Sequence, residues 1–188
     1  MIVGPQTEFF GLNHGPLYYY YAAPFYHLAQ WNPNIPLYAM IILNLSTLIP
    51  LVLLVQSLFK DRRITVVAAL LFAVAYQQVE YARWLSNVAI TIPMIAWMYY
   101  FLWQTLANNK RAFFTGVFTG LAIQGEFFLI FLIALCYVLF YLFSVSKKAV
   151  RNYHIGLLLG LSSFIAAEIK FSFLGSTTFF NTICWESF

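Results

Sequence analysis

Long apolar stretches separated by short charged clusters are the feature that most limits what this chain can fold into. Five stretches stand out, at residues 36–59, 64–79, 88–107, 111–143 and 152–170. Crossing about 30 Å of hydrocarbon takes roughly 20 residues of α-helix at 1.5 Å per residue. We therefore predict an all-α protein whose helices span a membrane.

The composition excludes a water-soluble globular domain. Hydrophobic residues make up 62% of the 188 residues and charged residues only 9%, whereas a soluble domain carries roughly 25% charged residues. Too few polar side chains are present to cover a water-exposed surface, so the lipid bilayer is the expected surroundings. The ten lysines and arginines form short clusters and not a continuous basic stripe, which argues against nucleic acid as a partner.

The stretch at residues 111–143 is too long for one span, and the basic residues indicate how it is divided. Membrane proteins keep an excess of lysine and arginine in their cytoplasmic loops. A turn near residues 124–126 would place eight of the ten basic residues on one side, leaving Arg83 and Lys170 opposite. A single span would separate these clusters. The eight residues are Lys60, Arg62, Arg63, Lys110, Arg111, Lys147, Lys148 and Arg151.

The resulting prediction is a polytopic transmembrane helix bundle of six spans, preceded by a helix at the outer membrane interface. Residues 1–35 are the outer-face loop with this aromatic helix, residues 36–170 the transmembrane bundle, and residues 171–188 an outer-face tail. Because the first span runs inward without a preceding targeting segment, we expect the chain to be truncated at its start. Its end stops without a final basic loop, so we expect truncation there too. The spans are expected at residues 36–59, 64–79, 88–107, 111–125, 127–144 and 152–170.

A tyrosine-rich segment follows the sequence Asn-His-Gly-Pro at residues 13–16. Proline is tolerated in the first turn of a helix, so a helix is expected to begin here. The four consecutive tyrosines at residues 18–21 cannot share one helical face. One interpretation is an aromatic belt at the membrane interface. The other is that His14 and tyrosine hydroxyls such as that of Tyr18 face a ligand head group at the membrane surface.

Glu80 and Arg83 lie between the second and third predicted spans, on the outer side. Residues three apart share a helical face and can pair, and a surface ion pair of this kind contributes little to stability. The alternative is that Arg83 is kept for an anion, because a guanidinium binds phosphate oxygens with two parallel hydrogen bonds.

Glu126 and Lys170 complete the set of candidate binding residues. An ionised carboxylate between two apolar stretches costs several kcal/mol unless it faces water or a partner, so Glu126 is a functional candidate, the alternative being a turn that reaches the interface. Lys170 ends the last span, where its side chain can extend to the interface without any further role. Together the candidates suit an anionic lipid head group carrying a polar substrate.

The sequence predicts no metal site and no cofactor. The three histidines are dispersed, so they offer no ligand spacing typical of a metal centre. The two cysteines, Cys136 and Cys184, lack paired spacing and predict no disulfide framework.

Several motifs occur in a characteristic order. They are GLNHGPLYYY at residues 11–20, APFY at 23–26, Asn-Pro at 32–33, EYARW at 80–84 with Asn87, and GLAIQ at 120–124. Together they resemble the prokaryotic glycosyltransferases related to protein O-mannosyltransferases and aminoarabinose transferases. The resemblance covers roughly residues 4 to 175.

The resemblance implies a multi-pass enzyme that takes a sugar from a polyprenyl-phosphate carrier on the outer face of the membrane. It implies that His14 contacts the carrier phosphate and that Arg83 is the family's outer-loop arginine. The family's catalytic carboxylate lies in an outer loop ahead of the tyrosine-rich segment. Glu8 is too close to that segment to take this role, so no catalytic residue is assigned. Family members commonly have a histidine where Glu126 stands.

Two other classes of membrane protein are compatible with parts of the sequence. A transporter or channel subunit would explain Glu126 and Glu168 as parts of a translocation path, although the candidate residues gather at one face and not at the membrane midplane. A structural membrane subunit would explain the hydrophobicity but not His14 and Arg83.

Overall fold

The computed structural model describes residues 15–30, 32 and 34–170 of the chain. All regular structure in this part is helical, which confirms the all-α prediction. The helices are α1 (Leu17–Leu28), α2 (Asn34–Leu45), α3 (Leu48–Phe59), α4 (Arg62–Val74), α5 (Tyr76–Ala82), α6 (Asn87–Asn108), α7 (Ala112–Gly125), the 3₁₀ helix η1 (Phe127–Ile130), α8 (Phe131–Leu142) and α9 (Lys147–Lys170).

The first predicted span corresponds to two helices, α2 and α3, with an irregular turn between them. Proline lacks the N–H that would continue the helical hydrogen bonds of the preceding turn, and Pro50 stands in the first turn of α3. The chain before it tightens instead, with Thr47 N–H donating to Asn44 O at 3.1 Å and Ile49 N–H donating to Ser46 O at 3.0 Å. The break therefore follows from the position of one proline.

The second predicted span, residues 64–79, is not one straight helix. The axes of α4 and α5 differ by 59°, because Ala75 between them has an extended conformation with ψ of 119°. The bend falls where the sequence changes from the apolar residues of α4 to the polar residues Gln77, Gln78 and Glu80 of α5. The predicted span thus joins an apolar helix to a short polar one.

Few of the described helices are long and apolar enough to cross a membrane. In the described part of the chain, Asn34–Phe59 is long and apolar enough, and the bent pair of α4 and α5 is a second candidate. The segments Ala112–Gly125 and Phe127–Leu142 are apolar but shorter. Six spans therefore stay a prediction.

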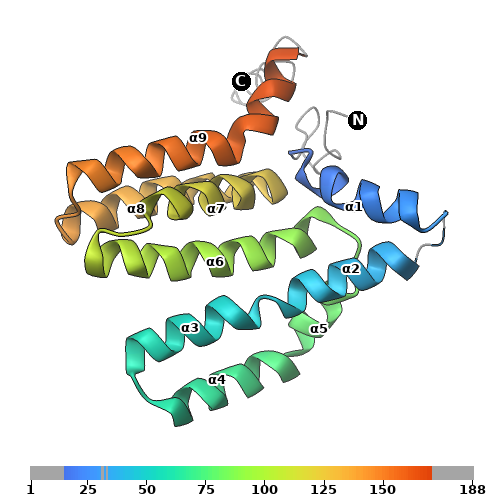
Figure 1. Cartoon of the computed structure of the whole chain (residues 1–188), viewed down its shortest axis with the longest axis horizontal. Helices are drawn as coiled ribbons and strands as arrows, with labels where there is room; N and C mark the ends of the chain where they lie inside the picture. The colour runs from blue at the N-terminus through green and yellow to red at the C-terminus, as the bar shows by residue number, and fades with distance from the viewer. Residues whose placement is uncertain (1–14, 31, 33, 171–188) are drawn as a thin grey trace, which may run out of the picture.

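The turn predicted at residues 124–126 is present. Helix α7 ends at Gly125, Glu126 is extended, and η1 begins at Phe127. The chain then returns, and Ser146 N–H donates to Asn109 Oδ1 at 2.6 Å. The loops after α3, α6 and α8 consequently lie at the same end of the molecule, which we call the basic end because it carries the eight clustered lysines and arginines (Figure 1).

Helices α7 and α9 pack closely through glycines. A Cβ atom on Gly116 would lie 2.0 Å from Tyr153 O, and one on Gly156 would lie 1.9 Å from Phe113 O. Gly120 and Gly160 also face each other across this contact. The two backbones are thus close enough that no side chain fits between them. Side chains from α6 and α8 pack around the same pair, among them Met98 and Cys136.

Candidate functional site

Helix α1 lies across the end of the molecule opposite the basic end (Figure 1). Its start is attached to α7, because Gly15 N–H donates to Gln124 O at 2.8 Å. Its middle is attached to α2, because the Tyr21 hydroxyl donates to Ala39 O at 2.7 Å. Tyr18 and Tyr21 pack with the buried Met40 and residues of α6. Helix α1 is therefore held on the end of the helices and does not run between them.

Tyr18 is half-buried on α1. Burial, and secondarily the neighbouring Tyr26 and Tyr19, raise the pKa of its hydroxyl to about 12. The hydroxyl therefore stays protonated at neutral pH and can donate a hydrogen bond. Tyr18 lines a cavity of about 770 Å³ along α1 together with Tyr19, Ala22, Ala23, Tyr26, His27 and Gln30.

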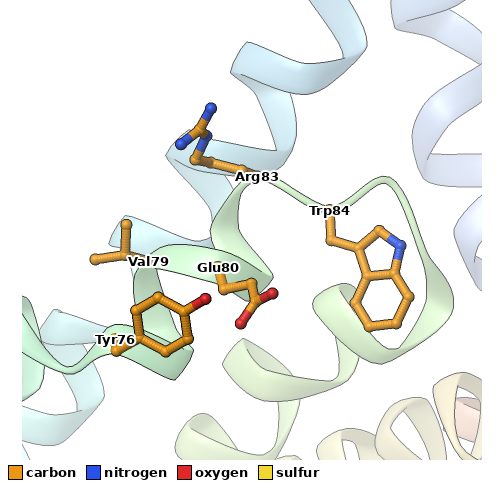
Figure 2. A pocket seen from close by; sticks show the side chains of 5 residues that line it. All are labelled: Tyr76, Val79, Glu80, Arg83 and Trp84. Atoms are coloured by element: carbon orange, nitrogen blue, oxygen red, sulfur yellow. The ribbon is translucent and has the colours of Figure 1, made fainter.

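Arg83 follows directly after α5, on a pocket of about 500 Å³ (Figure 2). Helix α5 follows the end of α4 that lies away from the basic end (Figure 1). Helix α5 ends at Ala82, and Arg83 N–H donates to Glu80 O at 3.1 Å. The Trp84 ring stacks on Tyr81 with ring centroids 5.8 Å apart. The pocket is lined by Tyr76, Val79, Glu80, Arg83 and Trp84.

Glu80 and Arg83 do not form the ion pair that their spacing would permit. Figure 2 shows the guanidinium directed away from the Glu80 carboxylate, and no ion pair joins these two described residues. The rule for residues three apart requires both to lie within one helix, whereas Arg83 stands beyond the end of α5 with φ of −97° and ψ of 3°. Its guanidinium is consequently not held by this neighbouring carboxylate.

Arg83 also lines a second cavity, of about 290 Å³, between α2–α3 and α4–α5. This cavity is mostly apolar, and we call it the apolar slot. The buried Asn44 side chain lines it, and Asn44 Nδ2 donates to Met40 O at 3.1 Å while its Oδ1 has no partner in the described part. Its lining residues are Ile41, Asn44, Leu45, Leu48, Phe72, Ala73, Gln78, Val79, Ala82 and Arg83.

The other predicted site residues are not gathered around Arg83. Glu126 is partly buried in the turn between α7 and η1, and its backbone N–H donates to Ala122 O at 3.0 Å. Lys170 is exposed at the last residue of α9. Neither lines the three cavities described above. His14 lies outside the described residues, directly before Gly15.

The family described as dolichyl-phosphate-mannose-protein mannosyltransferase matches residues 13–169. The chain belongs to this family. Comparison with curated proteins and with solved structures gives no match. Membership confirms the resemblance at the level of a mannosyltransferase-like family of membrane glycosyltransferases, which use polyprenyl-phosphate sugar donors.

The mannosyltransferase family match includes most of the candidate residues. It extends over His14, Tyr18, Glu80, Arg83 and Glu126 and ends one residue before Lys170. Among the described residues, no group of three or more histidines, cysteines, aspartates or glutamates is placed to hold a metal ion.

Two buried polar residues of this mannosyltransferase-family chain were not among the site residues predicted from the sequence. Gln124, 2% exposed, has hydrogen bonds to α9. Asn87, at the start of α6, is buried, and its Oδ1 has no partner in the described part of the chain. The sequence signal for both residues was an amide side chain beside a long apolar stretch. Such a side chain needs hydrogen-bond partners when it is buried.

Proposed function

We propose that this chain is part of a membrane glycosyltransferase that transfers a sugar from a polyprenyl-phosphate carrier to an acceptor on the outer face, and that Arg83 binds the carrier phosphate. One observation carries the proposal. Arg83 lines both a pocket with polar side chains and the apolar slot. A donor whose phosphate joins a sugar to an apolar chain matches this pair of cavities in chemistry.

In this arrangement the three parts of the donor occupy three kinds of surroundings. The first units of the lipid chain lie in the apolar slot, where burial removes apolar surface from water. The phosphate accepts hydrogen bonds from the guanidinium of Arg83, which can donate two in parallel. The sugar lies in the pocket with Tyr76, Glu80 and Trp84, where the Glu80 carboxylate can accept hydrogen bonds from sugar hydroxyls.

The positive charge of Arg83 also suits the chemistry of transfer. An acceptor hydroxyl or amine forms a bond to the anomeric carbon while the bond from that carbon to the phosphate oxygen breaks. The phosphate leaves with the electron pair, and a fixed cation stabilises the charge that develops on it. A carboxylate would take the acceptor proton, and that base stays unassigned. A single displacement of this kind inverts the configuration at the anomeric carbon.

The remaining candidate residues have supporting roles in the proposal. His14, the residue directly before Gly15, is a second phosphate contact. Tyr18 donates a hydrogen bond to the donor or acceptor, in agreement with its protonated hydroxyl. We assign Glu126 and Lys170 to binding of the acceptor on the outer face. They are not assigned to the phosphate, because neither lines the two cavities that Arg83 lines.

The proposed topology places six spans in the cell membrane, with the basic end in the cytoplasm and α1 on the outer face. The clustering of basic residues at one end supports it through the positive-inside rule. So do large apolar side chains on the outside of the bundle, such as Leu71, Leu142 and Leu158, each more than 60% exposed. Lipid accommodates such a surface, whereas water does not.

Cysteine labelling tests this topology. After replacement of Cys136 and Cys184, we expect Gln77→Cys to react with a membrane-impermeant maleimide in intact cells, because α5 is on the outer side. Asn108→Cys, at the basic end, should react only after permeabilisation. Both residues are exposed, so accessibility reports the side of the membrane. Labelling of residue 108 with protection of residue 77 in intact cells would show the opposite orientation.

A binding measurement tests the proposed donor. The protein in lipid nanodiscs is titrated with a polyprenyl phosphate and, separately, with the polyprenol of the same chain length. We expect the phosphate to bind at least about tenfold more tightly, because charge-assisted hydrogen bonds contribute about 1.5–3 kcal/mol each. Equal affinity for the two lipids would contradict the proposal. Inorganic phosphate, titrated in parallel, shows whether the apolar chain is needed.

A further inference from the structure

Two loops of the basic end are joined by a hydrogen bond. Ser146 N–H, directly before α9, donates to Asn109 Oδ1 at 2.6 Å, in the loop between α6 and α7. Asn109 ends α6 in a left-handed conformation with φ of 56°, which is common at the end of a helix. Lys110 follows Asn109 and Lys147 follows Ser146. The bond therefore brings the backbones of these two lysines together from segments 37 residues apart.

One face of α9 changes from charged to apolar along its length. Lys147 and Arg151 are four residues apart, and Ile155 and Leu158 follow at spacings of four and three, so the four side chains share a helical face. All four are exposed, Ile155 by 53% and Leu158 by 61%. The opposite face of α9, which includes the buried Tyr153, packs on α7. The outward face thus presents two cations and, beyond them, uncovered hydrocarbon.

Two polar rings lie between the charged part of this face and the apolar part. The Tyr137 hydroxyl of α8 hydrogen-bonds to His154 Nε2, and His154 Nδ1 donates to Val150 O at 2.7 Å. Tyrosine is enriched at the level where lipid head groups meet the hydrocarbon. Arg151 lies on the basic-end side of His154, and Leu158 lies beyond it. The order of residue types along α9 therefore follows the order of head group, interface and acyl chain in a lipid.

Acidic side chains of the chain do not neutralise these cations. Asp61 is the only acidic residue in the described loops of the basic end, and its carboxylate accepts from Arg63 N–H at 2.7 Å at the start of α4. Within the described part of the chain, no ion pair involves Lys110, Lys147 or Arg151. The positive-inside rule accounts for cations at this end. It does not account for the joining of two lysine-bearing loops beside an exposed apolar face.

We propose that this surface binds an acidic phospholipid of the cytoplasmic leaflet, and we call it the α9 lipid site. It consists of Lys110, Lys147, Arg151, Ile155 and Leu158. The head-group phosphate accepts hydrogen bonds from Arg151 and lies beside the lysines, and an acyl chain covers the two apolar residues. A soluble anion would match the cations but leave the apolar residues uncovered. The inference depends on the proposed membrane topology and is independent of the proposed sugar donor.

Lipid-specific fluorescence quenching tests the α9 lipid site in the whole chain. In protein with Cys136 and Cys184 replaced, Ile155→Cys carries a fluorophore in nanodiscs of phosphatidylcholine. A fraction of the lipid is then phosphatidylglycerol or phosphatidylcholine with a nitroxide on its acyl chain, which quenches only at short range. We expect phosphatidylglycerol to occupy this position at least about fivefold more than phosphatidylcholine, which corresponds to the attraction of one lysine or arginine to anionic lipid.

Two double variants with the same loss of charge distinguish a site from the general charge of this end. Lys147→Gln with Arg151→Gln should lower the preference for phosphatidylglycerol to about one. Arg62→Gln with Arg63→Gln, exposed at the start of α4, should leave the preference unchanged.

Three results would overturn the α9 lipid site. They are an equal loss of preference in both double variants, a wild-type protein without any preference, and a preference that inorganic phosphate abolishes at constant ionic strength. The last would show that the ligand is a soluble anion. None of these results bears on the titration with polyprenyl phosphate, whose failure would reject the proposed donor alone.

Discussion

Replacing Arg83 with lysine should weaken binding of polyprenyl phosphate about tenfold, and replacing it with alanine should weaken binding about a hundredfold. Lysine keeps the charge but cannot donate the two parallel hydrogen bonds of a guanidinium. Alanine removes the charge as well. Arg83 is exposed in the structure, and the proposed donor would cover it, so its truncation would remove one partner of a buried charge pair, which costs roughly 2–5 kcal/mol. A hundredfold change corresponds to about 2.7 kcal/mol. The measurement is lipid titration of the variants in nanodiscs.

Glu80→Gln is the matched control for this prediction. The two side chains do not pair in the structure, so neutralising Glu80 should leave the phosphate preference intact and affect mainly the sugar part of the donor. If instead Glu80→Gln and Arg83→Gln lowered the melting temperature equally, and the folded proteins kept their affinity for polyprenyl phosphate, Arg83 would be a structural partner of Glu80. That result would end its assignment to the phosphate.

Gly156→Ala should destabilise the protein, although the same change in an exposed helix would stabilise it. Alanine favours a helix over glycine by about 0.8–1.0 kcal/mol. At residue 156, however, the added Cβ would lie 1.9 Å from Phe113 O and 2.9 Å from Phe113 C, so α9 must move away from α7. Overpacking of this kind typically costs about 1–3 kcal/mol, and Gly156→Leu should prevent assembly of the pair altogether.

The direction of the change in melting temperature decides this test. Thermal unfolding in detergent is compared with Ser162→Ala, an exposed position on α9, where the added helix propensity should leave stability equal or slightly higher. A rise in melting temperature for Gly156→Ala would show that α7 and α9 are less closely packed than described. An unchanged value for both variants would contradict the close contact as well.

Much of the fold follows from local sequence. The apolar stretches locate the helices, and the positive-inside rule divided residues 111–143 at the place where Glu126 interrupts the helical structure. Hydropathy alone showed neither the break before Pro50 nor the bend at Ala75, because an apolar stretch has the same hydropathy whether its helix is straight or broken. The break has a local cause in the proline itself. Six membrane crossings stay a prediction, since the described helices alone do not establish them.

The sequence by itself determined the chemistry that is present: a cation among apolar helices, a tyrosine-rich helix with its glycine and proline, and motifs sufficient to suggest the family. Only the tertiary structure decided how these groups meet. That Arg83 is free of Glu80 depends on where α5 ends, and that it lines two cavities depends on the packing of α2–α3 against α4–α5. The contact of Gly15 with Gln124 requires the start of α1 to meet α7 and α9. Contacts between distant segments are set by packing, which no local pattern encodes.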